Sequence, residues 1–163
     1  MIALKDYQNR VLDSLREFFR LCSKTGSPAE AFRAVSEQNG SGGGLYLPIH
    51  AAGLERGMPY ICLRVPTGGG KTLLACHTAG LAMSALLHAD RAVVLWLVPS
   101  NTILDQTADA LRDARHPYRR ALEMACGAIE VVTIEEALNL PRASVDGQPV
   151  VIVSTIQAFR VED

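Results

Sequence analysis

The sequence has little of several things that mark specialised classes of protein. Its 163 residues include 4 cysteines and 1 tryptophan, and its charged side chains almost cancel, leaving a formal net charge of -1. The cysteines lie far apart and lack the C-x-x-C pairs of structural zinc sites, so we expect thiols in a reducing compartment. A near-zero net charge neither favours nor excludes a nucleic-acid partner, because a DNA-binding stripe can be local.

Long hydrophobic runs are also missing. The most apolar stretch, Val93–Val98, is far too short to span a bilayer. Near the start, Lys5 and Asp6 lie inside an amphipathic pattern, which argues against a signal peptide. Hydrophobic residues make up 48% and charged residues 20%, the balance of an ordinary globular protein of about one domain. We therefore expect a cytoplasmic protein with no membrane partner.

The order of the predicted elements indicates an α/β protein with a parallel sheet. Two amphipathic helices come first, the second beginning at a capping box, Ser27 to Glu30, and ending at Asn39. The stretch 41–44 is typical of a flexible loop. Strands and helices then alternate, and the strand at 93–98 is apolar throughout, as expected when both sheet faces are covered. The predicted elements are helices at 4–21 and 27–39, a strand at 61–65, a helix at 73–87, a strand at 93–98, a helix at 102–124 kinked at 116–117, and strands at 129–133 and 150–153.

The strongest motif is a P-loop, Val65-Pro66-Thr67-Gly68-Gly69-Gly70-Lys71-Thr72. Triphosphate binding needs backbone N–H groups curled around an anion, and glycine allows that curl with open access. The helix that follows adds its positive N-terminal dipole, Lys71 can reach the β- and γ-phosphates, and the Thr72 hydroxyl can ligate magnesium. We therefore predict ATP and Mg²⁺ as cofactors. Val65 stands where the general motif has its first glycine, and the alternative is a glycine-rich turn that merely precedes Lys-Thr.

Three further stretches accompany the P-loop: Leu4-Lys5-Asp6-Tyr7-Gln8, Leu97 to Gln106, and Val151 to Phe159. With them the chain resembles a superfamily 2 helicase, and more narrowly the restriction subunit of type III restriction enzymes and its DEAD/DEAH-box relatives. In that superfamily the P-loop is commonly written without its first glycine. The resemblance implies a P-loop NTPase (RecA-like) three-layer parallel sheet, incomplete, preceded by an N-terminal helical segment. It implies a division into 1–57, the helical segment with the glutamine motif and Gly-rich loop, and 58–163, a partial ATP-binding domain.

The resemblance also implies site residues. Gln8 corresponds to an adenine-recognising glutamine, and a carboxamide can donate to and accept from the adenine edge. The alternative for Gln8 is an ordinary polar residue on the exposed face of the first helix. Thr67 and the three glycines, with Lys71 and Thr72, would bind the nucleotide.

Two strand-end motifs imply contact with the backbone of double-stranded DNA, the expected partner. A strand that ends in Pro-Ser and opens a helix offers N–H groups and a hydroxyl to phosphate. Plain helix caps are the alternative in both places. A modification methyltransferase is a further partner that the family implies. The residues matched to these motifs are Pro99, Ser100, Asn101 and Gln106 in the first and Thr155 in the second.

The acidic DEAD/DEAH motif that hydrolysis requires does not follow the second strand-end motif here. An apolar run followed by Glu135 and Glu136 lies earlier in the chain, in the wrong order for the family, and Thr133 with Glu136 forms a capping box that explains the acids. We therefore expect an N-terminal fragment or an incomplete gene product that binds ATP but turns it over weakly or not at all.

Three other functions remain open at the level of sequence. One is a helicase-family ATPase outside restriction, acting on DNA or RNA, and another is a stand-alone nucleotide-binding module. A third, a P-loop kinase, would need an arginine-rich lid. The only arginine cluster is more typical of a solvated surface than of a lid, with a basic edge for DNA as the other option; its members are Arg112, Arg115, Arg119 and Arg120.

Overall fold

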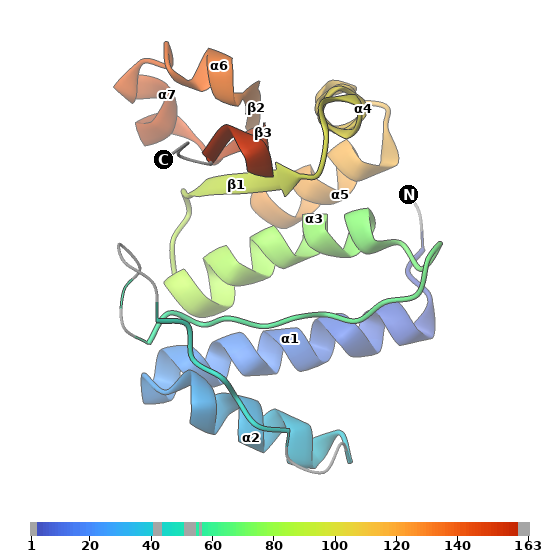
Figure 1. Ribbon diagram of the computed structural model, residues 1–163, viewed down its shortest axis with the longest axis vertical. Coiled ribbons are helices and arrows are strands. Elements are labelled where there is room, and N and C mark those ends of the chain that lie inside the picture. Colours follow the sequence, from blue (N-terminus) through green and yellow to red (C-terminus); the bar gives the residue numbers. More distant parts are fainter. Residues whose placement is uncertain (1–2, 41–43, 51–54, 56, 160–163) are drawn as a thin grey trace. The chain divides into compact units, whose positions relative to one another are not determined.

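The computed structural model describes residues 3–40, 44–50, 55 and 57–159. They form two compact units, a helical unit, Ala3–His88, and a sheet unit that begins at Ala89 (Figure 1). The division into domains between residues 57 and 58 stays a prediction. Of the predicted glycine-rich loop at 41–44, residues 41–43 lie outside the described residues.

The helical unit follows the predicted order of helices. Helix α1 (Asp6–Thr25) ends at Gly26, whose φ of 67° lies in the left-handed region, and α2 (Pro28–Gln38) begins after Ser27, whose side chain accepts from Glu30 N–H. Helix α3 (Lys71–Leu81) continues as a π-helical stretch, η1 (Ala82–Leu87). The structure thus confirms the serine cap and the end of the second helix at Asn39. The predicted capping box is incomplete, because Ser27 N–H donates to Thr25 Oγ1 rather than to Glu30.

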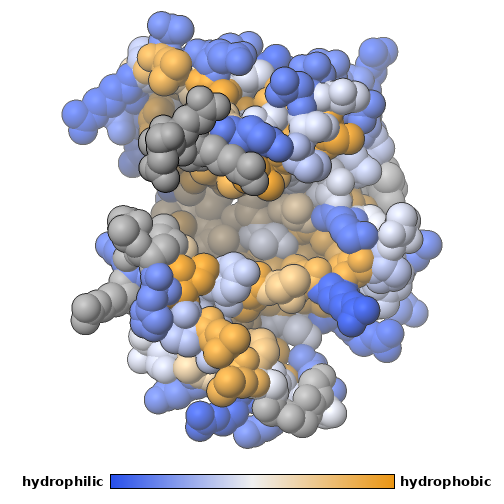
Figure 2. Space-filling model, viewed as in Figure 1, coloured by the Kyte–Doolittle hydropathy of each residue, from blue (hydrophilic) through white to orange (hydrophobic). Residues whose placement is uncertain are grey.

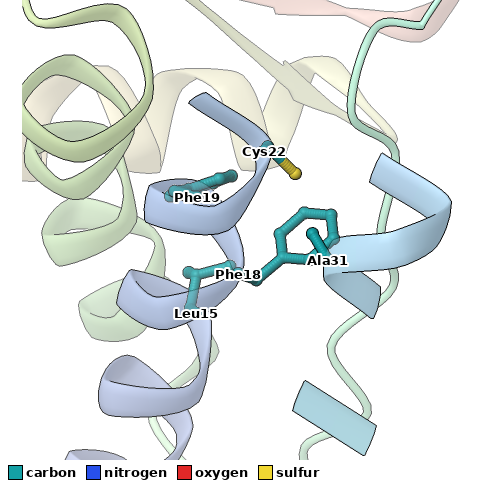
Figure 3. Close-up of a cluster of buried hydrophobic side chains, with 5 residues drawn as sticks. All are labelled: Leu15, Phe18, Phe19, Cys22 and Ala31. Carbon is teal, nitrogen blue, oxygen red and sulfur yellow. The ribbon is translucent and has the colours of Figure 1, made fainter. Parts of the chain in front are cut away.

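A small apolar core holds α1 to α2. Figure 3 shows Leu15, Phe18, Phe19 and Cys22 along α1, with Ala31 of α2 beside them, and all five are buried. Burial raises the pKa of the Cys22 thiol to about 11, so this cysteine serves packing rather than reactivity. Partly buried side chains of η1, among them Leu86, pack against the same cluster.

The predicted strand at 61–65 is wrong. The segment is extended but pairs with no neighbour, and the described part of the helical unit contains no other strand that could complete a ladder. Its apolar pattern has another cause, because Val65 packs with Leu12 and Leu74 in a buried cluster. Several of its other side chains are exposed, and Figure 2 shows hydrophobic side chains on the surface where the extended chain crosses this unit.

The sheet unit is built on three parallel strands, β1 (Val93–Val98), β2 (Glu130–Thr133) and β3 (Val150–Thr155), in the order β1-β3-β2. The central strand, β3, is the most buried, as its apolar sequence predicts. The helices of this unit are α4 (Asn101–Arg112), α5 (Pro117–Cys126), α6 (Ile134–Ala137) and α7 (Arg142–Gly147), followed by the 3-10 turn η2 (Ile156–Phe159). The structure confirms the predicted break at His116-Pro117.

One expectation about β1 is also wrong. Val93, Leu95 and Leu97 point to one face of the strand and are about half exposed, whereas full cover of both faces was expected. The strand lies at one edge of the described sheet, where a single neighbour shields it. The chain is nevertheless α/β, with an N-terminal helical segment and a parallel sheet, as predicted. In the described residues no helix combines the length and apolar character needed to cross a membrane.

Candidate nucleotide-binding site

The glycine loop is a tight turn that requires glycine for two reasons, a left-handed backbone and close contact with neighbouring atoms. Gly68 and Gly70 have φ angles of 76° and 79°, which side-chain-bearing residues rarely adopt. Gly69 donates its N–H to Pro66 O at 3.0 Å, and a Cβ on Gly69 would lie 2.6 Å from Val65 Cγ1. A Cβ on Gly68 would meet nothing within 4 Å, so the loop is open on that side.

The loop runs directly into the N-terminus of α3. Its N-cap is Gly70, which has no side chain to satisfy the first N–H groups of the helix, and the first turn carries no acid. Lys71 is exposed and its ammonium donates to Pro66 O at 3.0 Å. Thr72 follows at the next helical position and is half-buried. Free N–H groups, the helix dipole and one lysine therefore gather at the same helix end.

Two side chains of α1 donate hydrogen bonds to the main chain of the glycine loop. The Tyr7 hydroxyl donates to Gly69 O at 2.7 Å, and Gln8 Nε2 donates to the same oxygen at 2.9 Å. Gln8 Oε1 accepts from Lys5 N–H at 2.9 Å, which caps α1. Gln8 is only 5% exposed, so the alternative of an ordinary exposed polar residue is wrong. Tyr7 was missed in the sequence, where its only signal is its place beside Gln8.

These residues fit a magnesium nucleotide. The open side of the loop at Gly68 leaves space for phosphate oxygens, and the N–H groups at the start of α3 supply donors for them. The Thr72 hydroxyl is an oxygen ligand of the kind that Mg²⁺ prefers. Gln8 keeps one N–H and one lone pair beyond its two hydrogen bonds, so its carboxamide retains the capacity for a base.

A separate groove of about 560 Å³ lies in the helical unit between α1, α2 and residues 61–63. Tyr7 lies at its wall, but none of the loop residues 66–72 lines it. Most of its lining is apolar, from side chains such as Phe18 and Phe32. The groove is therefore distinct from the phosphate-binding loop.

In the sheet unit the two strand-end motifs lie together. Val98 and Thr155 are register partners at the carboxyl ends of β1 and β3. Just beyond them, Gln157 Nε2 donates to Pro99 O at 3.0 Å and joins the two motifs. Sequence reasoning did not single out Gln157 as a site residue, although it belongs to the second motif.

Both motifs also use their hydroxyls as local caps. Ser100 is exposed and its Oγ accepts from Ile103 N–H at 3.4 Å, while Thr155 is 7% exposed and its Oγ1 accepts from Ala158 N–H at 3.3 Å. Asn101 and Gln106 are exposed on α4. The roles of these residues in nucleic-acid contact stay predictions.

The arginine cluster serves structure in two of its four members. Arg119, 16% exposed, donates to Leu111 O and Ile129 O and pairs with Glu123 at 2.7 Å. Arg112 donates to Val131 O and pairs with Glu136. Arg119 is therefore held against main-chain carbonyls and does not lie on a solvated surface, whereas Arg112 makes its contacts with its side chain 38% exposed.

The structure confirms the capping box at Thr133. Its side chain accepts from Glu136 N–H, and Glu136 Oε2 accepts from Thr133 N–H at 2.6 Å. This backbone hydrogen bond, with the charge of Arg112, lowers the pKa of Glu136. Among the described residues no group of three His, Cys, Asp or Glu side chains could hold a metal ion.

A glycine loop that enters a helix at Lys-Thr, together with a parallel α/β sheet, defines a P-loop protein with an incomplete RecA-like fold. The chain belongs to the family described as type III restriction enzyme, res subunit, which it matches over residues 1–163. Members of this family carry a helicase-like ATPase region. Comparison with curated proteins gives no match, and comparison with solved structures gives none.

Proposed function

We propose that this chain is the ATP-binding part of an ATP-driven DNA translocase or helicase of the type III restriction class. The observation that carries the proposal is the glycine loop, which opens onto the first turn of α3 with Lys71 beside it. Thr67 to Thr72 form the nucleotide site in this proposal, and Gln8 contacts the base.

The chemistry of the site follows from its charges. The N–H groups of the first helical turn and the Lys71 ammonium bind phosphate oxygens and offset their negative charge. Lys71 exchanges Pro66 O for phosphate when nucleotide enters, because its side chain is exposed and held by one carbonyl. Thr72 would hold Mg²⁺, which supplies charge neutralisation between phosphate groups.

The test of ATP binding is Lys71→Ala in the whole chain, measured by calorimetry with Mg·ATP. Loss of the ammonium should weaken affinity by at least about tenfold, the effect of removing a charge-assisted hydrogen bond. The matched control is Lys24→Ala, which removes the same charge at the far end of α1. Unchanged affinity in Lys71→Ala would refute the nucleotide site.

Double-stranded DNA is the proposed partner of the strand-end motifs, through Pro99, Ser100, Asn101, Gln106 and Thr155. Gln157 brings the two motifs together, and the exposed start of α4 offers N–H groups to phosphate. Such contacts carry no base specificity. A modification methyltransferase would be a partner of the complete assembly.

Ser100 allows the cap to be separated from a DNA contact. Asp and Asn both keep an N-cap acceptor, whereas only Asp places a negative charge beside a phosphate. Ser100→Asp should lower DNA affinity by roughly tenfold at low salt, with a smaller loss at high salt, and Ser100→Asn should bind almost as the wild type. Equal DNA affinity of Ser100→Asp and the wild type would exclude the contact, and a matching series with RNA would separate the two nucleic acids.

We further propose that the chain itself hydrolyses ATP weakly. Glu136, one of the two acids that follow the apolar run at 131–133, is held in a capping box and an ion pair. Glu136→Gln should therefore leave any residual ATPase rate unchanged, and a fall in that rate would contradict the proposal.

A further inference from the structure

The oxygen of Gly69 is held by two side-chain donors from outside the loop. The Tyr7 hydroxyl lies 2.7 Å from it and Gln8 Nε2 lies 2.9 Å from it, 62 and 61 residues away in sequence. One donor suffices to satisfy a carbonyl, so the second adds directional restraint. Both donors come from the first turn of α1, which the Gln8 side chain itself caps.

The direction of this oxygen fixes the direction of the next N–H. The Gly69–Gly70 peptide is trans, and in a planar trans peptide the C=O and N–H bonds point to opposite sides. With Gly69 O directed at α1, the Gly70 N–H is directed away from α1. In the described residues no acceptor is bonded to the Gly70 N–H. The N–H of the preceding residue, Gly69, is by contrast bonded to Pro66 O.

Without these two donors, the plane of the Gly69–Gly70 peptide would flip easily. Gly69 and Gly70 have no Cβ, so both dihedrals that flank the peptide plane are permissive. A flipped peptide would present a carbonyl oxygen, rather than a donor, to an incoming phosphate. A further restraint comes from Gly70, where a Cβ would lie 2.5 Å from Gln8 Nε2, so the loop is packed closely against the donor.

We propose that Tyr7 is a positioning residue that, together with Gln8, locks the Gly69–Gly70 peptide so that Gly70 N–H is aimed at phosphate before nucleotide arrives. The inference rests on the proposed ATP site. It assigns to Tyr7 a role in binding the phosphates, without contact to the base or the metal. Pre-orientation strengthens binding because the cost of ordering the loop is met by folding rather than by the ligand.

The test is Tyr7→Phe in the whole chain, with binding of Mg·ATP and of magnesium tripolyphosphate measured by calorimetry. Phe keeps the ring and loses only the hydroxyl, so affinity for both ligands should fall by a similar factor, roughly three- to tenfold. The matched control is Tyr46→Phe, because the Tyr46 hydroxyl accepts from Tyr60 N–H at 2.9 Å in the same unit but away from the loop. It should leave both affinities unchanged.

A second variant removes the other donor. Gln8→Glu keeps an acceptor for Lys5 N–H, and hence the helix cap, but its carboxylate cannot donate to Gly69 O. Tripolyphosphate affinity should fall again, by at least the factor seen for Tyr7→Phe. In NMR spectra of the free variants, the Gly70 amide signal should broaden through peptide exchange, while the amide of Gly26 should not change.

The outcomes separate this inference from the proposed function. Tyr7→Phe with wild-type tripolyphosphate affinity overturns the peptide lock, and so does a loss confined to ATP, which would place Tyr7 at the base. If Lys71→Ala also leaves ATP binding unchanged, the nucleotide site itself fails. If Lys71→Ala weakens binding and Tyr7→Phe does not, the site stands and only the lock is refuted.

Discussion

The glycine loop and the strand ends of the sheet unit are held in contrasting ways. The loop depends on Tyr7 and Gln8, more than 60 residues away in sequence, whereas Ser100 and Thr155 bond to groups three residues further along the chain. A locally bonded turn forms wherever its helix forms. A loop braced from a distant helix forms only when the whole helical unit has folded, so its geometry reports the integrity of that unit.

The largest expected effect tests the distant bracing. Gly70→Ala places a Cβ at 2.5 Å from Gln8 Nε2 and forces a side chain into the left-handed region, which alone costs about 1–2 kcal/mol. We expect ATP affinity to fall at least about tenfold, together with a loss of about 2–3 kcal/mol in the free energy of unfolding.

The control is Gly26→Ala, which has a similar positive φ of 67° but open space around its Cβ. It should cost about 1 kcal/mol of stability and leave ATP affinity unchanged. If both substitutions lowered ATP affinity equally, the effect of Gly70→Ala could not be assigned to its contact with Gln8 of α1.

An intermediate effect is expected in the sheet unit. Arg119→Met leaves Leu111 O and Ile129 O without their donor and removes the pair with Glu123, so stability should fall by about 2 kcal/mol. Hydrogen exchange should quicken in the sheet unit, and ATP affinity should stay at its wild-type value. The control is Arg115→Met, because the Arg115 side chain is exposed, and this substitution should change hydrogen exchange little. A loss of ATP affinity in Arg119→Met would show that the two units do not behave separately.

The smallest effect concerns the locally held turn at Thr133. The pKa of Glu136 is lowered in the folded state. Ionised Glu136 therefore stabilises the fold at pH values above its ordinary pKa of 4.5, and this stabilisation is lost as the pH falls through the pKa of the folded state. Glu136→Gln should therefore be less stable than the wild type at pH 7, by under about 1 kcal/mol since the pair is exposed, and the difference should vanish in acid.

Thermal unfolding across pH measures this difference. Glu135→Gln removes a neighbouring charge outside the capping box and should have the smaller effect at pH 7. A difference for Glu136→Gln that grows in acid would contradict the assigned direction of the pKa shift.

The contrast also explains what the sequence could predict. The caps at Ser27 and Thr133 and the break at His116-Pro117 were correct because each depends on residues within a few positions. The parallel sheet followed from the alternation of elements. The family resemblance supplied Gln8, which periodicity alone would have left on a surface.

The failures have long-range causes. Residues 61–65 have the composition of a strand, but a strand exists only with a paired neighbour, and the described helical unit offers none. Likewise the apolar run of β1 does not reveal that Val93, Leu95 and Leu97 lie half exposed at an edge strand. The donation from Tyr7 to Gly69 O is invisible for the same reason, since no local pattern links positions 62 residues apart.

The bracing of Gly69 O has a practical consequence for anyone who trims this protein. A truncated version that starts at residue 58, where the motif-based boundary falls, would retain every letter of the P-loop from Val65 to Thr72. It would nevertheless discard both donors that orient the Gly69–Gly70 peptide. Motif content is therefore a poor guide to where this chain can be cut, and the first eight residues belong to the smallest portion worth expressing for nucleotide-binding work.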